Sequence, residues 1–507
     1  MRFTRSSGIL LHLTSLPGQF GIGDLGAAAY RFVDFLAASG QSLWQILPLG
    51  PTSGGNNNSP YVSLSAFAGS PLLISLEALT KDELLPVSAL VEVPVLAEAE
   101  ADYDQARLYK LPILQIASER FTSFAPHHWK TAFADFCQQQ QWWLDDYALF
   151  MALREVFHEE SWHSWEPELV YREPSALRNW RGRLAQDILF HKHLQFFFFT
   201  QWTRLKTYAN QRGIRIIGDL PIYVGLDSAE VWSHPELFLL DSHTGTPFAV
   251  AGVPPDAFSE TGQLWGNPLY RWRDEQGQPV EAVYEWWVRR FRSTLELTDI
   301  LRVDHFRGFE AYWSVPAAEE TAINGQWIAG PGAGLFTRVQ NALGDLPVIA
   351  EDLGVITPEV DALRLQFGFP GMKVLQFAFD GTATNPYLPH NYTDPRCVVY
   401  TGTHDNETTR GWFRSSPPER RGAILRYLGR SQGPELPWHM IRLALSSVAC
   451  MAIIPLQDIL GLGNEGRMNT PGQPEGNWRW RYQSGALNSA LSVRLAELTR
   501  TYGRDKG

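Results

Sequence analysis

The feature of this sequence that most constrains its fold is a series of short apolar segments separated by helical patterns. The eight segments comprise residues 8–15, 42–50, 214–224, 299–306, 346–354, 372–379, 397–406 and 450–459. Helical patterns precede several of them, for example at 26–40 and 335–344. Strands that alternate with helices form parallel sheets, and eight such units predict an α/β fold of the (β/α)₈ TIM barrel type.

The spacing of the segments is uneven, so we predict one catalytic barrel over residues 1–507 with two large insertions. Residues 51–210, after the second strand, form an inserted and mainly helical subdomain. Residues 225–285, after the third strand, are rich in Trp, Pro and Gly without clear periodicity, and we expect a lid or a binding wall there. A stripe of large apolar residues in the first insertion has helical spacing, which is typical of core packing. The stripe consists of Trp143, Tyr147, Phe150 and Met151.

Charge and apolar pattern exclude two classes of partner. The 54 acidic residues outnumber the 43 basic residues and give a net charge of -11, without a Lys/Arg block that would bind nucleic acid. No apolar segment approaches the roughly 18 residues that a membrane-spanning helix needs, and the N-terminus lacks the pattern of a signal peptide. We expect a soluble, cytoplasmic protein without nucleic-acid or membrane partners, and a monomer, with a homodimer as the alternative.

The cysteine and tryptophan residues say less about function than the charge does. Cys137, Cys397 and Cys450 lie far apart and lack metal-type spacing, so neither a disulfide framework nor a zinc site is expected. The chain has 19 Trp, several of them in Gly/Pro/Asn-rich stretches. Such residues either stack on sugar rings or fill a large core, and composition alone favours neither.

Four of the predicted strands end in a carboxylate. They are Asp219 in "IIGDLP", Asp304 in "LRVDHF", Glu351 in "VIAEDLG" and Asp405 in "GTHDNE". In a β/α barrel the reacting groups lie at the carboxyl ends of the strands, where they converge on one mouth. We therefore expect these four side chains to lie close together.

The neighbours of two of these carboxylates predict different protonation states. Side chains alternate along a strand, so Arg302 and Asp304 point to the same side and the guanidinium stabilises the ionised carboxylate. Glu351 follows two apolar residues, where desolvation keeps a carboxyl protonated. Glycosyl transfer requires such a pair, because one carboxylate attacks the sugar and the other protonates the leaving oxygen. Asp405, beside His404, would hold sugar hydroxyls.

Two other interpretations of these residues stay open at this point. Each charged pair could be a buried ion pair or a cap at a strand end, without chemistry. His404, Asp405 and the Asp304–His305 pair would also suit a metal ion. Against a metal site, no His-x-His or His-x-x-x-His pattern falls on a strand end, and "HKH" at 191–193 lies in a predicted helix. We expect neither a metal nor a cofactor.

The motifs, taken together, resemble a known family. "GDLPIYV", "LRVDHFRG", "IAEDLG" and "GTHDNET" occur in the order found in the 4-α-glucanotransferases called amylomaltases or disproportionating enzymes, within the α-amylase superfamily. "VPPDAFSETGQLWGNPLY" at 253–270 and "GLGNEGRMNTPG" at 461–472 strengthen the likeness, which extends over nearly the whole chain.

The resemblance implies roles for individual residues. Asp304 would be the nucleophile, Glu351 the general acid/base and Asp405 the stabiliser of the transition state. The implied substrate-binding residues are Arg302, His404, Asp219, Tyr61, Trp265, Asn469 and Asp380. Within that set, Tyr61 would stack near the scissile bond, and Trp265 and Asn469 would belong to loops that enclose the glucan. His305 and Arg307 are left with supporting roles.

The implied reaction is transfer of an α-1,4-glucan segment between maltooligosaccharides or longer glucans through a covalent glycosyl-enzyme intermediate. Two residues depart from the family pattern: Ala257, where a large aromatic is expected in a lid loop, and Gly466, where Ala is usual. We expect the first to weaken acceptor stacking and the second to change loop flexibility. A hydrolase of the same superfamily is the main alternative. A non-catalytic glucan-binding protein would have lost one of the three carboxylates, and all three are present.

Overall fold

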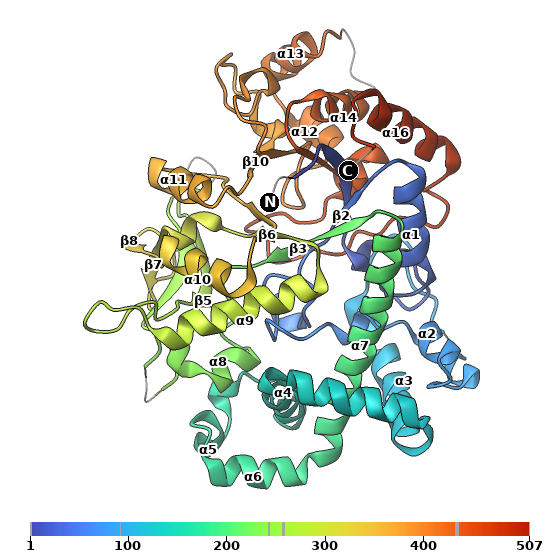
Figure 1. The fold of residues 1–507 in the computed structure, drawn as a ribbon, viewed down its shortest axis with the longest axis vertical. Coiled ribbons are helices and arrows are strands. Elements are labelled where there is room, and N and C mark those ends of the chain that lie inside the picture. Colours follow the sequence, from blue (N-terminus) through green and yellow to red (C-terminus); the bar gives the residue numbers. More distant parts are fainter. Residues whose placement is uncertain (1–2, 92, 242–243, 256–258, 431–434, 506–507) are drawn as a thin grey trace.

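An eight-stranded parallel sheet forms the centre of the molecule (Figure 1). The computed structural model describes residues 3–91, 93–241, 244–255, 259–430 and 435–505. The sheet order is β10-β11-β12-β1-β2-β3-β6-β9, and every neighbouring pair in it is parallel. Its strands are β1 (Ser6–Leu10), β2 (Leu43–Gln45), β3 (Arg215–Leu220), β6 (Ile300–Val303), β9 (Val348–Ala350), β10 (Gly371–Val374), β11 (Cys397–Tyr400) and β12 (Met451–Pro455).

The two edges of this sheet meet and close it into a barrel. The Ala350 N–H at the end of β9 donates to the carbonyl of Pro370, just before β10, at 2.9 Å. Strands adjacent in the barrel are also consecutive among the eight, as a singly wound barrel requires. Each predicted apolar segment contributes one strand, so the predicted (β/α)₈ barrel is confirmed.

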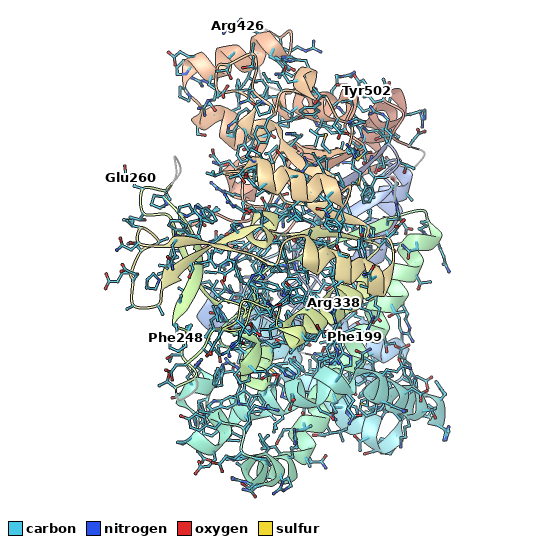
Figure 2. All side chains as sticks on the ribbon, turned by 60° about the vertical axis from the view of Figure 1, so that its left-hand side comes forward. Phe199, Phe248, Glu260, Arg338, Arg426 and Tyr502 are labelled. Carbon is cyan, nitrogen blue, oxygen red and sulfur yellow. The ribbon has the colours of Figure 1, made fainter. Side chains whose placement is uncertain are left out.

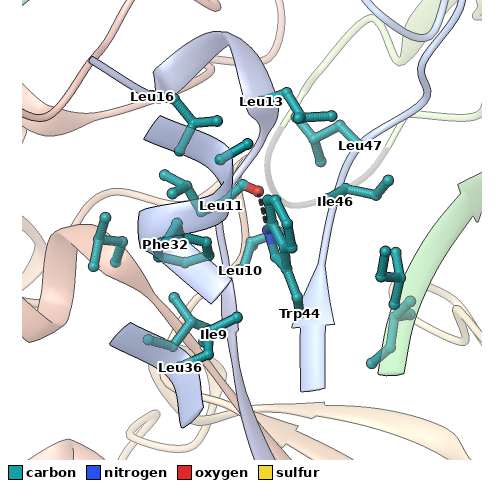
Figure 3. Close-up of a cluster of buried hydrophobic side chains, with 14 of the residues drawn as sticks. Ile9, Leu10, Leu11, Leu13, Leu16, Phe32, Leu36, Trp44, Ile46 and Leu47 are labelled. Carbon is teal, nitrogen blue, oxygen red and sulfur yellow. Dashed lines mark hydrogen bonds between the residues drawn. The ribbon is translucent and has the colours of Figure 1, made fainter. Parts of the chain in front are cut away.

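The strands read as continuous apolar runs because they are buried on both faces. Figure 3 shows this where β1 and β2 meet the helix α1 (Ala27–Ala38). Ile9 on β1, Trp44 on β2 and Phe32 on α1 are each fully buried. The one polar atom of the indole is satisfied, since Trp44 Nε1 donates to the Leu11 carbonyl at 2.8 Å.

Helices surround the barrel, and α1 and α10 (Ala333–Leu343) fall where the sequence predicts them. α7 (Ala185–Gln211) leads into β3, and the helices that follow β3, besides α10, are α8 (Ala229–Ser233), α9 (Glu281–Leu297), α11 (Pro358–Gln366), α12 (Thr409–Ser415), α13 (Pro418–Tyr427), α14 (Leu436–Ser446), α15 (Leu456–Ile459) and α16 (Ser489–Thr501). Residues 375–396, all described, connect β10 to β11 without an α-helix. None of the helices in the described ranges is both long enough and apolar enough to cross a membrane.

Most of the segment between β2 and β3 is helical and forms the lower layer in Figure 1. Its helices are α2 (Leu76–Lys81), α3 (Tyr103–Phe124), α4 (His127–Val156), α5 (Pro167–Val170) and α6 (Pro174–Arg183), before α7 returns to the barrel. Trp143, Tyr147 and Phe150 of the predicted stripe are buried on α4, so the core interpretation is right. The division at residues 51–210 stays a prediction.

A second, smaller sheet lies beside the barrel and was not expected from the sequence. It is antiparallel, in the order β5-β4-β7-β8, and consists of β4 (Ala249–Val253), β5 (Gln263–Pro268), β7 (Ala311–Pro316) and β8 (Gln326–Ala329). Figure 2 shows Phe248 and Glu260 on this side of the molecule. The segment 225–285 contributes β4 and β5 to this sheet, and its role as a lid stays a prediction. β4 pairs with β7 across the intervening α9 and β6, and local periodicity carries no signal for such a distant partner.

The two chain ends are held together by a buried arginine. Arg504 is fully buried, and its guanidinium donates to the carbonyls of Ser6, Leu445, Ser447 and Ala449 at 2.7–3.1 Å. These four acceptors come from β1, from the last turn of α14 and from the segment between α14 and β12. The last turns of the chain therefore complete the packing around the first strand.

Glycine at position 8 is required by the close approach of β1 and β2. A Cβ there would lie 2.3 Å from the Leu43 carbonyl oxygen, a backbone atom of the neighbouring strand. We predict that Gly8→Ala lowers the free energy of unfolding by about 1–3 kcal/mol through overpacking, measured by urea titration.

The matched control is Gly182→Ala on α6. A Cβ at Gly182 meets no described heavy atom within 4 Å, and alanine is the better helix former by roughly 0.5–1 kcal/mol. This variant should be unchanged or slightly more stable than the wild type. Equal unfolding midpoints for Gly8→Ala and Gly182→Ala would contradict the packing argument.

Candidate active site

The carboxyl ends of four barrel strands bring the predicted charged residues to one mouth. Asp219 lies in β3, Arg302 lies in β6 with Asp304 directly after it, Glu351 directly follows β9, and His404 and Asp405 lie in the turn after β11. This is the end of a β/α barrel at which enzymes place their reacting groups.

The guanidinium of Arg302 joins two of these carboxylates. Its side chain is only 4% exposed, and Nη1 lies 2.7 Å from Asp219 Oδ1 and 2.9 Å from Asp304 Oδ1. Burial alone would lower the pKa of Arg302, but the charges of Asp219 and Asp304 outweigh it and raise the pKa well above its usual value. The Asp219 side chain is fully buried, whereas the Asp304 side chain is 25% exposed. Asp304 is thus the carboxylate of this pair that a ligand can reach.

Glu351 is held by the backbone rather than by a cation. Its Oε2 accepts from the His305 N–H at 2.7 Å and its Oε1 from the Leu353 N–H at 2.9 Å. Burial raises the pKa of Glu351 to about 7, and the charge of Asp304 acts in the same direction, against the opposing effects of Arg302 and the two N–H groups. Near neutral pH this carboxyl therefore holds a proton in a substantial fraction of molecules.

His305 contributes to this arrangement through its backbone. It adopts a left-handed conformation with φ of 48°, which is uncommon outside glycine and marks a constrained turn. That turn directs the His305 N–H at Glu351, while burial lowers the pKa of the His305 imidazole to about 4. The imidazole is thus neutral, consistent with a supporting role.

Asp405 has an environment opposite to that of Glu351. Its Oδ1 accepts from Asn469 Nδ2 at 2.6 Å, and its Oδ2 lies 3.2 Å from His404 Nε2. Desolvation opposes the charged form, but His404 and Asn469 outweigh it and lower the pKa of Asp405 to about 2. The same contact raises the pKa of His404 in spite of its burial. Asp405 stays ionised, and its side chain is 43% exposed.

Tyr61 links the two halves of the cluster. Its hydroxyl donates to Asp219 Oδ2 at 2.7 Å and lies 2.9 Å from His404 Nε2. Its ring stacks on the His404 imidazole, with ring centroids 5.2 Å apart. The Trp478 ring lies at a tilt to the Tyr61 ring, with centroids 5.9 Å apart. Trp478 was not predicted as a site residue, because in the sequence only the Trp-rich composition pointed to it.

The remaining predicted binding residues fall into two groups. Asn469 reaches the cluster directly, through Asp405. The Trp265 ring packs edge-on against His305, with centroids 4.8 Å apart, so it borders the cluster. Asp380 is exposed, and its carboxylate accepts from the Thr382 N–H and hydroxyl in its own turn. The described hydrogen bonds of Asp380 thus stay within its loop and do not join it to the charged cluster.

Two polar residues near the mouth were not anticipated. Arg467 donates to the Asp405 carbonyl at 3.0 Å and to the Asn469 carbonyl at 2.8 Å, which fixes one loop to the other. Asp458 lies in α15, three residues after β12 ends, and is a fifth carboxylate near a strand end. It is 1% exposed and accepts from the Thr401 hydroxyl and the Thr409 N–H, so it ties loops together.

The two departures from the family pattern are Ala257 and Gly466. Ala257 lies outside the described residues. Gly466 ends the 3₁₀ turn η10 (Asn464–Gly466), and a Cβ there would lie 3.0–3.1 Å from Leu462 side-chain atoms. The missing methyl group therefore lets this loop pack closely, an effect on packing as well as on flexibility.

A cavity adjoins the charged cluster, and Tyr61, Phe67, Asp219 and Tyr223 are among its lining residues. Within the described ranges, His, Cys, Asp and Glu side chains do not gather in groups of three or more around a point that could hold a metal ion. The arrangement thus offers a reachable carboxylate beside a cation, a carboxyl with a raised pKa, and an ionised carboxylate with a lowered pKa. Acid/base-assisted displacement at a sugar carbon uses these groups.

Comparisons with known proteins agree with this chemistry. The family model described as 4-alpha-glucanotransferase matches residues 11–488. The 4-alpha-glucanotransferase of Synechocystis sp. is 53% identical over 502 residues, covering 99% of this chain and 98% of that protein. The 4-alpha-glucanotransferase of Thermus thermophilus is 49% identical over 512 residues, covering 99% and 100%.

The fold agrees as well. The solved amylomaltase from Streptococcus agalactiae in complex with acarbose is similar with a TM-score of 0.94 and 40% sequence identity, and the match covers 99% of each chain. A family model that spans nearly the whole chain, with relatives of this identity, shows the family. This chain belongs to the 4-α-glucanotransferases, the amylomaltase or disproportionating-enzyme family.

Proposed function

We propose that this 4-α-glucanotransferase works by a retaining double displacement in which Asp304 is the nucleophile and Glu351 the general acid/base. The observation that carries the proposal is the difference between the two groups. Asp304 is paired with Arg302 at 2.9 Å, whereas burial raises the pKa of Glu351 to about 7. One group is thus suited to attack as an anion and the other to donate a proton.

In the first step an Asp304 carboxylate oxygen attacks C1 of a glucose unit in an α-1,4-linked donor. The bond between C1 and the glycosidic oxygen breaks, and that oxygen takes the proton of Glu351 and leaves as the 4-hydroxyl of the departing chain. A β-glycosyl ester on Asp304 results. Retention requires the two carboxyl groups to stand roughly 5–5.5 Å apart.

In the second step a 4-hydroxyl of an acceptor glucan gives its proton to Glu351 and attacks C1. The ester bond to C1 breaks, Asp304 is released as a carboxylate, and the α configuration returns. Atoms and protons balance without a metal ion or an activated sugar donor, because the donor linkage is of the same kind as the linkage formed.

Asp405 and His404 would bind the sugar in the cleavage subsite and stabilise its transition state. Positive charge develops at the anomeric centre in the transition state, and an anion fixed nearby stabilises it. The low pKa of Asp405, about 2, keeps it charged throughout the reaction. Asn469 and Arg467 hold it in place from the 461–472 loop.

Transfer rather than hydrolysis requires that an acceptor sugar compete with water. Binding and orientation give an acceptor an advantage of up to about 7–11 kcal/mol in ideal cases, and walls that exclude water add to it. We assign this role to the 461–472 loop and to the segment 225–285, whose Trp265 borders the cluster. Membership of the family favours transfer over the hydrolase alternative. We propose α-1,4-glucans and maltooligosaccharides as donors and acceptors.

The product pattern from maltotriose tests this function. We predict glucose together with a ladder of maltooligosaccharides longer than maltotriose, separated by chromatography of the reaction mixture. Glucose and maltose as the sole products would contradict transfer and favour a hydrolase.

The pH dependence tests the role of Glu351. The proton is needed in the first step, and the protonated fraction falls as the pH rises through the pKa of about 7. We predict that kcat/KM for maltotriose falls above about pH 7, approaching tenfold per pH unit at higher pH.

An activated donor provides the control. Fluoride leaves without protonation, so the first step of Glu351→Gln with α-maltotriosyl fluoride should keep a substantial rate and lose the alkaline fall, while maltotriose is hardly used. An unchanged alkaline fall of fluoride release in this variant would assign the titration to another group.

A further inference from the structure

A second groove lies on the flank of the barrel, between α4, α9 and the short helix α8 (Ala229–Ser233). α8 follows β3, whose carboxyl end carries Asp219, and α9 leads into β6, so the first turns of α9 lie toward the catalytic mouth. The groove encloses about 230 Å³, far more than the roughly 10–15 Å³ that one water molecule needs. It can therefore hold a sugar unit.

The groove has an aromatic lining formed by Phe67, Trp142, Trp143 and Trp286. Phe67 lies at its centre, with ring centroids 4.6 Å from Trp142 and 5.7 Å from Trp286. Trp142 is partly exposed, whereas Trp143 and Trp286 are buried. Phe67 also lines the cavity beside Tyr61 and Asp219, so the two hollows share one wall.

One indole in this lining has an unmet hydrogen bond. Trp143 Nε1 donates to Gln140 Oε1 at 2.7 Å, but Trp286 Nε1 finds no acceptor among the described residues although the side chain is only 6% exposed. Buried polar groups in native structures are nearly always paired. The Trp286 Nε1 atom is itself buried, so this indole offers the groove its ring rather than its N–H.

The charges around the groove indicate a neutral and hydroxylated ligand. The lining carboxylates of Asp146 and Glu285 are ion-paired with Arg172 and Arg338, and Glu236 lies 3.1 Å from His234. The groove therefore carries little unbalanced charge, which suits a neutral ligand. Carboxylates accept hydrogen bonds from hydroxyl groups, and aromatic faces pack on the apolar C–H faces of sugar rings.

We propose that this groove is a secondary binding site for an α-1,4-glucan chain, separate from the charged cluster. The inference rests on the proposed function for the identity of the glucan. A long chain held here lies along the wall that the groove shares with the catalytic cavity, which raises its effective concentration at the mouth. Short donors gain nothing from it.

Two variants of opposite kind test the site. Trp142→Ala removes the exposed aromatic platform, and Ala282→Trp fills the groove from an exposed position on α9 without removing any packing. The matched control is Trp129→Ala, a partly buried tryptophan on the same helix that packs on Phe196, away from the groove. Thermal melting verifies that each full-length variant is folded, and Ala282→Trp carries the test if Trp142→Ala is not.

We predict that both groove variants raise KM for soluble amylose about fivefold, the effect of losing one stacking contact, and migrate faster than the wild type in native gels that contain amylose. Their kcat/KM for maltotriose should stay within about twofold of the wild type, and Trp129→Ala should behave as the wild type in both assays. Unchanged retardation by amylose in the folded groove variants would overturn the site. An equal loss with maltotriose would overturn its separateness from the cluster. If the proposed function itself were wrong, the wild type would form no ladder of longer maltooligosaccharides from maltotriose.

Discussion

The buried guanidinium of Arg302 is the interaction on which the rest of the site depends. It lies directly opposite Asp219 in the register of β3 and β6, so the pairing of these two strands itself places the cation beside its first anion. Asp304, two residues further along, completes the pair. Burying a carboxylate without a partner costs several kcal/mol, and this single cation stabilises two of them. The mouth can therefore hold a dense group of carboxylates in a folded protein.

Burial and the placement of cations together shift the protonation of the carboxyl groups. His404 and Asn469 outweigh desolvation at Asp405 and lower its pKa to about 2. The described hydrogen bonds of Glu351 come from two backbone N–H groups, and burial raises its pKa to about 7. The carboxyl groups of Asp405 and Glu351 have similar intrinsic acidity, but their surroundings keep Asp405 ionised and favour a proton on Glu351. That separation is what a displacement with acid assistance needs.

The sequence predicted the features that depend on local pattern. Apolar runs located the barrel strands, and strand alternation placed Arg302 beside Asp304. The pairing of β4 with β7 and the packing of Trp478 on Tyr61 were not predicted. Both depend on contacts between distant parts of the sequence, which local patterns do not indicate. The resemblance supplied Asn469 as a loop residue, but its bond to Asp405 depends on how the loops fold over the mouth.

If Asp304 is the nucleophile, it forms a covalent ester with the sugar, and this intermediate can be trapped. In Glu351→Gln, α-maltotriosyl fluoride loses fluoride without an acid, and the ester accumulates because no base activates the acceptor. Mass spectrometry of the quenched and digested protein should then find one maltotriosyl group on the peptide that carries Asp304. A maltotriosyl group on any other residue, or fluoride release without an adduct, would contradict the account.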